Sequence, residues 1–140
     1  MEKGLILDAF NMKEQDIRTY SPLCLAYLGD AVYDMIIRTY LVEMGNRPVN
    51  ELNRMKVKLV NAGAQSEMVK ALEDILTEEE KDIVRRGKNS KPASTAKNAS
   101  LSDYHRATGF EALMGYLYLT DRQERIMELI RAGIEKINKE

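Results

Sequence analysis

The apolar residues of this 140-residue chain recur at helical spacing, and no segment alternates in the manner of a β-strand. The strongest helical pattern begins at Ser21-Pro22, where serine is a favoured N-cap and proline a favoured first residue, and it ends at Gly45. The residues that we expect on the inner face of this helix are Leu25, Leu28, Val32, Met35 or Ile36, and Thr39.

A second helical region follows at about residues 50–76, and Gly63 could kink or divide it. The expected inner stripe of this region is Leu52, Met55, Leu59, Ala62, Met68, Ala71, Leu72 and Ile75. Thr77 and Glu80 then have the spacing of a capping box, which predicts a short helix that ends near Gly87.

Residues 88–100 are polar, basic and rich in Ser, Ala and Asn, which predicts a loop. Ser102 is the expected N-cap of a helix over residues 103–119, and a last amphipathic helix covers roughly residues 122–137. With 44% hydrophobic and 31% charged residues, the chain can bury a core of its own. The fold class predicted is all-α, with residues 1–140 forming a single domain.

Composition excludes several classes of protein. The single cysteine, Cys24, cannot form a disulfide framework or a cysteine-based zinc site. The most apolar region, residues 22–42, contains Asp30, Asp34 and Arg38, which a membrane span would not tolerate cheaply. The N-terminus lacks the apolar run of a signal peptide. We therefore expect a cytoplasmic protein with no membrane partner.

Charge is unevenly distributed although the net charge is only −1. Residues 73–82 hold six acids and one lysine, whereas residues 84–99 hold five basic residues and no acid. Such a switch indicates one surface that meets a polyanion and one that does not. The basic residues are Arg85, Arg86, Lys88, Lys91 and Lys97.

Two carboxylates, Asp30 and Glu111, lie inside apolar helical segments and are flanked by glycines. A carboxylate on a buried face is costly unless a cation or donor meets it, and glycine inside a helix indicates close approach of another group. Either acid could pair with an arginine such as Arg38 or Arg106. Alternatively, if the two helices cross, the pair could hold a hard divalent cation such as Mg²⁺, which binds through few carboxylates and keeps several waters.

Other polar residues have simpler explanations. Asp34 lies one turn after Asp30 and could join a cation site, but we expect it to form a surface ion pair. His105 is the only histidine, so a histidine-rich metal site is excluded, and we interpret it as structural or solvated. Tyr104, Tyr116 and Tyr118 have helical spacing, which favours core or interface positions over base-stacking platforms.

Two motifs in the chain match the ribonuclease III family. The segment LAYLGDAVY at residues 25–33 resembles its signature helix, Leu-Glu-Phe-Leu-Gly-Asp-Ala, and TGFEALMG at residues 108–115 resembles its second acidic motif, Asp-x-x-Glu-Ala-Leu-x-Gly. The tyrosine in the first motif, the RRGKN run at residues 85–89 and ATGFEAL at residues 107–113 resemble the Mini-ribonuclease III branch specifically. The resemblance covers about residues 20–130.

The resemblance implies a Mg²⁺-dependent endoribonuclease that cuts double-stranded RNA and leaves 5′-phosphate and 3′-hydroxyl ends. It assigns catalysis and metal binding to Asp30 and Glu111, and it implies a homodimer with Leu23, Tyr27 and Leu28 at the interface. The implied task is maturation of the ends of precursor 23S ribosomal RNA. A ribosomal protein could act as a partner on the pre-ribosome. The residues expected to contact RNA are Arg85, Arg86, Lys88, Asn89, Lys91 and Lys97, with Arg47, Arg54, Lys56 and Lys58 as a weaker set.

The chain departs from the wider family at two acidic positions. Ala26 stands where the family has a glutamate before the signature aspartate, and Thr108 stands where it has an aspartate before the second glutamate. We therefore expect more water in the metal shell, and Thr108 could support one such water. A separate double-stranded-RNA-binding domain is expected to be absent, so that the basic loop must supply phosphate contacts.

Two other functions remain open on the sequence. A non-catalytic double-stranded-RNA-binding module for ribosome assembly would also explain the loss of two acids. An all-α, Mg²⁺-dependent nucleotide pyrophosphohydrolase would place several acids at Glu-x-x-Glu spacing, but here that spacing occurs only in surface-like runs such as residues 78–82.

Overall fold

The computed structural model describes residues 1–90 and 100–139. The described residues are all-helical, as predicted. The elements are α1 (Lys3–Ala9), the 3-10 helix η1 (Ile17–Thr19), α2 (Pro22–Glu43), α3 (Val49–Val60), α4 (Ala62–Leu72), α5 (Glu78–Lys88), α6 (Leu101–Leu119) and α7 (Gln123–Asn138). None of these helices is long and apolar enough to cross a membrane.

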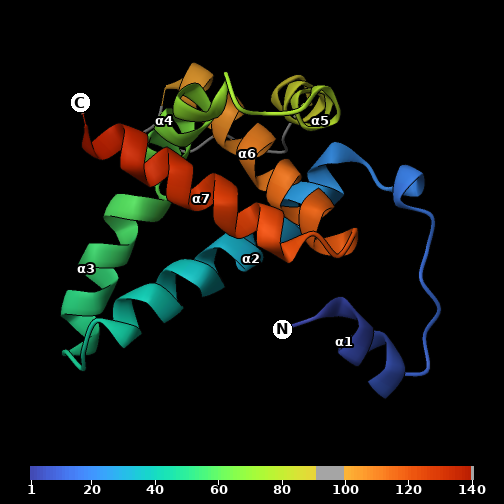
Figure 1. The fold of residues 1–140 in the computed structure, drawn as a ribbon, viewed down its shortest axis with the longest axis horizontal. Coiled ribbons are helices and arrows are strands. Elements are labelled where there is room, and N and C mark those ends of the chain that lie inside the picture. The colour runs from blue at the N-terminus through green and yellow to red at the C-terminus, as the bar shows by residue number, and fades with distance from the viewer. Residues whose placement is uncertain (91–99, 140) are drawn as a thin grey trace.

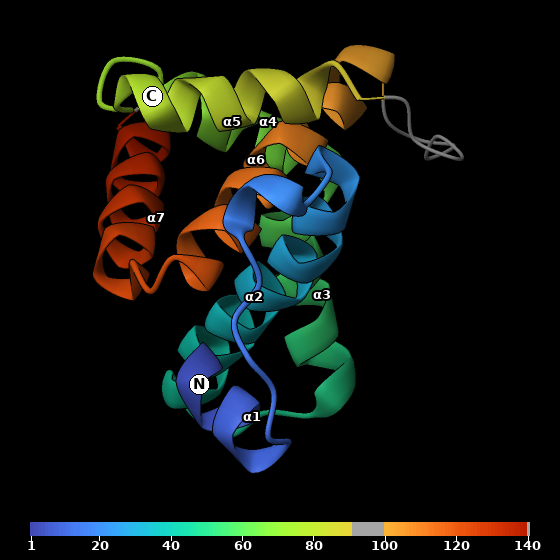
Figure 2. The ribbon, with the colours of Figure 1, turned by 90° about the vertical axis from the view of Figure 1, so that its right-hand side faces the viewer.

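Helix α6 is the centre of the bundle. It makes its most extensive contact with α2, packs against α4 and α5, and touches α7 (Figure 1). Helix α3 packs on α2 and α4, and α5 lies across one end of the bundle while α1 lies near the other (Figure 2). The two helices that carry Asp30 and Glu111 are therefore the pair with the closest association in the fold.

The core forms where α2 and α6 meet. Tyr33 of α2 and Phe110 of α6 are almost fully buried, and their rings pack edge to face with centroids 5.0 Å apart. Leu72 of α4, Leu117 of α6 and Leu129 of α7 complete the interior without exposure to solvent. Burial of such large apolar side chains supplies most of the stability of a helical bundle.

The inner face predicted for α2 was partly wrong. Leu25 and Val32 are buried, and Leu28 and Ile36 pack against the core, but Met35 is 46% exposed and Thr39 is exposed. Tyr33, Ile37 and Leu41 are buried instead. The helix is apolar nearly all round, so spacing alone left its rotation ambiguous.

Helix boundaries follow the capping residues. Ser21 caps α2 as predicted, since its Oγ accepts a hydrogen bond from the backbone N–H of Cys24. The region of residues 50–76 divides at Asn61, whose side chain caps α4, rather than at Gly63. The predicted cap at Ser102 was wrong, because Ser100 accepts from the N–H of Asp103 and the helix begins at Leu101.

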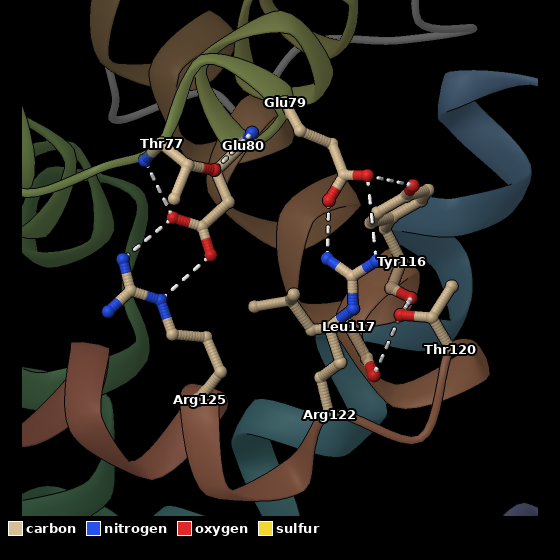
Figure 3. A network of polar contacts seen from close by, with 8 residues as sticks. All are labelled: Thr77, Glu79, Glu80, Tyr116, Leu117, Thr120, Arg122 and Arg125. Carbon is tan, nitrogen blue, oxygen red and sulfur yellow. Dashed lines mark hydrogen bonds and ion pairs between the residues drawn. The ribbon is translucent and has the colours of Figure 1, made fainter.

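The acidic start of α5 is clamped to α7 by the polar network in Figure 3. The capping box of Thr77 and Glu80 forms as predicted, and Glu80 also receives two hydrogen bonds of 2.8 Å from the guanidinium of Arg125. Beside it, Glu79 pairs with Arg122 and accepts from the hydroxyl of Tyr116 at 3.1 Å.

Glu80 is only 2% exposed, so the expectation that residues 78–82 form a surface-like acidic run was wrong at that position. Arg125 of α7 allows this carboxylate to be buried because it pairs with the charge. The spacing of acids within the run cannot reveal a partner from another helix.

Candidate active site

The site is set by a backbone contact between α2 and α6 at two glycines. A Cβ added to Gly29 would lie 1.7 Å from the carbonyl oxygen of Glu111, and one added to Gly115 would lie 2.0 Å from the carbonyl oxygen of Leu25. Real Cβ atoms essentially never approach within 3.0 Å, so only glycine fits at either position. The flanking glycines thus serve close helix packing, as predicted, and this crossing brings Asp30 beside Glu111.

The two carboxylates differ in environment. Asp30 is exposed, so the expectation that it lies on a buried face was wrong, whereas Glu111 is half-buried. Burial above all, together with the neighbouring Asp30 carboxylate, raises the pKa of Glu111 to about 8. A carboxyl group perturbed by a second carboxylate is a characteristic feature of functional sites.

Neither acid is neutralised by a basic side chain within the described part of the chain. Arg38 instead pairs with Asp34 at 2.5 Å, and Arg106 lies 3.8 Å from Asp103. The Nζ of Lys56 also lies 3.2 Å from the Oδ1 of Asp34, which confirms Asp34 as an ion-paired residue. Of the two explanations open on the sequence, pairing with arginine was therefore wrong.

A buried amide of α4, Gln65, was missed from the sequence. Its side chain is 2% exposed, and it acts on Glu111 in the direction that lowers the pKa of that carboxyl. The signal was available, since Gln65 falls midway between Ala62 and Met68 at three-residue steps along the expected inner stripe. A polar residue there should have been interpreted as part of a buried polar site.

The two positions at which the wider family carries acids are buried in this structure. Ala26 and Thr108 are 7% and 6% exposed, and the Thr108 hydroxyl donates a hydrogen bond to the carbonyl of Tyr104 at 3.0 Å. Threonine commonly bonds back into its own helix in this manner. Among residues 1–90 and 100–139 there is no cluster of three or more His, Cys, Asp or Glu side chains that could hold a metal ion.

The basic end of α5 lies against α6 close to this pair. A Cβ on Gly87 would lie 2.7 Å from the Cα of Gly109, two residues before Glu111 in the chain. Arg85 and Arg86 are exposed there, although Arg85 also pairs with Asp82.

Only some of the other residues expected to contact RNA lie at this end of α5. Lys88 is half-buried and Asn89 is exposed at the C-cap, while Lys91 and Lys97 lie outside the described residues. In the weaker set, Arg54 and Lys58 are exposed on α3, whereas Lys56 is engaged by Asp34 and Arg47 donates to the sulfur of Met55.

The remaining candidates are His105 on α6 and three residues near the start of α2. His105 is half-buried and packs edge to face against Tyr104, as expected of a structural residue. On the outer face of α2, Tyr27 is 84% exposed and Leu23 is 37% exposed, while Leu28 is partly buried. An exposed tyrosine and leucine one turn apart on an apolar helix form an unpartnered surface.

The all-helical fold is that of a class of endoribonuclease domain. Residues 23–122 match the Ribonuclease III domain family, and the chain belongs to that family. The enzyme is an endoribonuclease of the ribonuclease III type.

Within the family, the chain is similar to proteins named Mini-ribonuclease 3. It is 46% identical to that of Thermoanaerobacter sp. (strain X514), covering 98% of this chain and 99% of the relative. It is 46% identical to that of Enterococcus faecalis, covering 88% and 95%. A crystal structure of a protein from Fusobacterium nucleatum superposes with a TM-score of 0.79 at 37% identity and covers 87% of this chain and 99% of that one.

Proposed function

We propose that this protein cuts both strands of double-stranded RNA by Mg²⁺-dependent hydrolysis at the Asp30–Glu111 pair. The observation that carries the proposal is the glycine-mediated crossing of α2 and α6, which sets these two carboxylates together with no basic side chain from the described residues between them. The buried position of Glu111 and the nearby Asp30 carboxylate oppose ionisation of Glu111, and a divalent cation would relieve that cost.

The residues present fit Mg²⁺. The site offers carboxylate oxygens from Asp30 and Glu111, which are the ligands that a hard cation prefers. When bound, Mg²⁺ would supply positive charge that activates water and stabilises the phosphodiester transition state. Asp30 and Glu111 would hold it, and in-line attack of water would leave 5′-phosphate and 3′-hydroxyl ends.

The basic end of α5 and the segment after it would hold the substrate. Arg85, Arg86, Lys88 and Asn89, with Lys91 and Lys97 beyond them, supply contacts to phosphates. Double-stranded RNA is recognised mainly by shape, phosphates and 2′-hydroxyls, so such a surface needs little base specificity. The natural substrate that we propose is the paired ends of precursor 23S ribosomal RNA, on a pre-ribosome where a ribosomal protein could assist.

Cutting two strands requires two sites, which a symmetric dimer would provide. The exposed outer face of α2, with Tyr27 and Leu23, has the apolar character of an isologous interface. Leu28 would contribute from the edge of this face.

The test is cleavage of a long RNA duplex in Mg²⁺, with product ends identified by enzymatic labelling. Asp30→Asn and Glu111→Gln should each reduce cleavage by several orders of magnitude, because each removes a charged ligand. Asp34→Asn is the matched control: this acid lies one turn away, is paired with Arg38 and Lys56, and should be dispensable for cleavage.

Two outcomes would contradict the proposal. Duplex binding by the wild type without cleavage would favour a binding module, and hydrolysis of nucleotides in place of duplex RNA would favour a pyrophosphohydrolase. Equal losses in Asp34→Asn and Asp30→Asn would show that the Asp30–Glu111 pair is not the catalytic centre.

A further inference from the structure

Helix α1 reverses the usual pattern of burial. Lys3 is buried, whereas Leu5 is 64% exposed and Phe10, at the C-cap, is 72% exposed. Apolar residues are normally buried and lysine is normally exposed. The large apolar side chains that residues 1–12 expose are Met1, Leu5, Ile6, Phe10 and Met12. A group of exposed apolar side chains of this kind marks an interaction surface.

Lys3 holds α1 in this orientation. Its Nζ donates hydrogen bonds to the carbonyl oxygen of Leu119 at 2.6 Å and to the Oε1 of Glu14 at 2.8 Å, and it lies 3.5 Å from the Oδ2 of Asp121. Leu119 is the last residue of α6, and a cation is favourable at the carboxyl end of a helix. The lysine therefore ties the inner face of α1 to the end of α6, and the apolar face is turned outward.

Acids flank the centre of this outer face. At about 100° per residue, Leu5 lies about 200° around the helix from Lys3, and Glu2 and Asp8 lie about 60° to either side of Leu5. Both acids are exposed. The outer face of α1 is thus apolar at its centre and negative at its edges, so a matching groove should be apolar and carry positive charge.

The chain has such a groove between α2 and α3. Its volume is about 150 Å³, which is enough for one benzene-sized ring. Four apolar residues and two cations line it: Leu41, Val42, Val49, Leu52, Arg38 and Lys56. Both cations pair with a single acid, Asp34, so these three side chains together keep one net positive charge. The groove therefore complements the outer face of α1, and Phe10 has a ring of the size that it accepts.

Helix α1 is held away from the groove of its own chain. Both lie at the end of the molecule away from α5 (Figures 1 and 2), but they lie on opposite sides of that end in Figure 1, and Lys3 ties α1 to α6. Helix α2 spans the distance between them. A two-fold axis near the middle of α2 would bring α1 of each copy to the groove of the other, which is how an isologous dimer closes.

We infer that α1 of one protomer docks in the groove between α2 and α3 of a second copy of this chain, with Phe10 as its anchor. This inference rests on the proposed function, because it adds a second contact to the dimer proposed there. A second copy is the partner that the observations favour, since one chain supplies both the helix and the groove that complements it. Residues 1–22 lie outside the stretch of 23–122 that matches the family, so the contact belongs to this chain's own N-terminal segment.

Photochemical cross-linking tests the contact directly. The full chain carries p-benzoylphenylalanine in place of Phe10, and it is mixed with isotope-labelled wild type under conditions in which subunits exchange. We expect a dimer-sized product that joins residue 10 of one chain to a peptide from residues 38–56 of the labelled chain. Products confined to one chain, products that join residue 10 to another surface, or the absence of a dimer-sized product would overturn the inference.

Sedimentation equilibrium gives an independent measurement of the same contact. The double variant Leu5→Glu/Phe10→Glu should raise the dimer dissociation constant about 10-fold or more, because it places two acids in an apolar groove. Met127→Glu is the matched control: Met127 is also an exposed apolar residue but lies on α7, so this variant should dimerise as wild type does. If the double variant does not fold, Asp8→Lys decides. It should weaken the dimer more at low salt than at high salt, and an unchanged dissociation constant would refute the contact.

The failure of this inference can be distinguished from the failure of the proposed dimer. If the wild type stays monomeric, the dimer of the proposed function fails and the docking of α1 fails with it. If the wild type dimerises and Tyr27→Asp does not, while Leu5→Glu/Phe10→Glu matches wild type, the dimer stands and only the docking of α1 is refuted.

Discussion

The crossing of α2 and α6 predicts that one methyl group at Gly29 will damage both stability and catalysis. Its Cβ would lie 1.7 Å from the backbone oxygen of Glu111, so the helices must separate by more than 1 Å to reach the 3.0 Å limit of real contacts. Overpacking of this kind costs up to about 3 kcal/mol or slightly more. Alanine regains about 1 kcal/mol of helix propensity, which leaves a net loss of about 2 kcal/mol.

The assay for Gly29→Ala is urea and thermal unfolding followed by circular dichroism, combined with duplex cleavage. For a domain of this size the expected loss lowers the melting temperature by roughly 6–8 °C. Because the contact is with the backbone of Glu111, helix separation also moves that carboxylate relative to Asp30. A misplacement of about 1 Å can cost about 100-fold in rate, so cleavage should fall even well below the melting temperature.

Gly63→Ala is the matched control for Gly29→Ala. A Cβ at Gly63, also in a helix, meets only the Oδ1 of Asn61 at 3.4 Å, an ordinary contact. This variant should be neutral or more stable by up to about 1 kcal/mol, with unchanged cleavage. The reasoning is refuted if Gly29→Ala is as stable and as active as Gly63→Ala, because the two helices would then not meet through backbone at the site.

Three further predictions address the Glu80–Arg125 ion pair, the lysines of residues 88–97 and the outer face of α2. Glu80→Gln should lose about 2–3 kcal/mol of stability at neutral pH, since it breaks a buried pair whose arginine is partly exposed. Arg125 holds the pKa of Glu80 below its usual range. The stability that this ion pair contributes is therefore present above the pKa that Glu80 has in the unfolded chain, and it is lost as pH falls through the lower pKa that Glu80 has in the folded protein. Urea midpoints of the wild type and Glu80→Gln should therefore converge in acid, and a constant gap would contradict this account. Neutralising Lys88, Lys91 and Lys97 together should weaken duplex binding and flatten its salt dependence, and an unchanged slope in filter binding would exclude the segment. Tyr27→Asp should give a monomer in analytical ultracentrifugation, because it places a charge on the face that we propose for the dimer, and persistence of a dimer would move the interface elsewhere.

The sequence predicted the helices well because their ends carry local chemical signals. Ser21 and Thr77 cap the helices that they were expected to cap, and the hydrogen bonds involved span only three residues. The error at Ser102 has the same origin, since Ser100 and Ser102 are both suitable caps and nothing local decides between them. Asn61 was overlooked because the glycine two residues later was the more obvious interruption.

The parts of the site that could not be predicted depend on contacts between helices. Spacing within α2 could not reveal that Asp30 is exposed, because the helix is apolar on nearly every face. Burial of Glu80 depends on Arg125, which lies in a different helix and 45 residues further along the chain. Gln65 reaches Glu111 only through the packing of α4 on α6. Tertiary partners of this kind have no signature in a single sequence.

The departures at Ala26 and Thr108 acquire a physical meaning from this packing. Both positions are buried, so an acid at either would add a desolvated negative charge beside Glu111, where burial and Asp30 already oppose ionisation. A site with fewer acids lowers that cost, but it also leaves the waters of a bound cation with fewer acceptors. Variants that place an acid at position 26 should therefore tighten metal binding at the expense of stability in the cation-free protein.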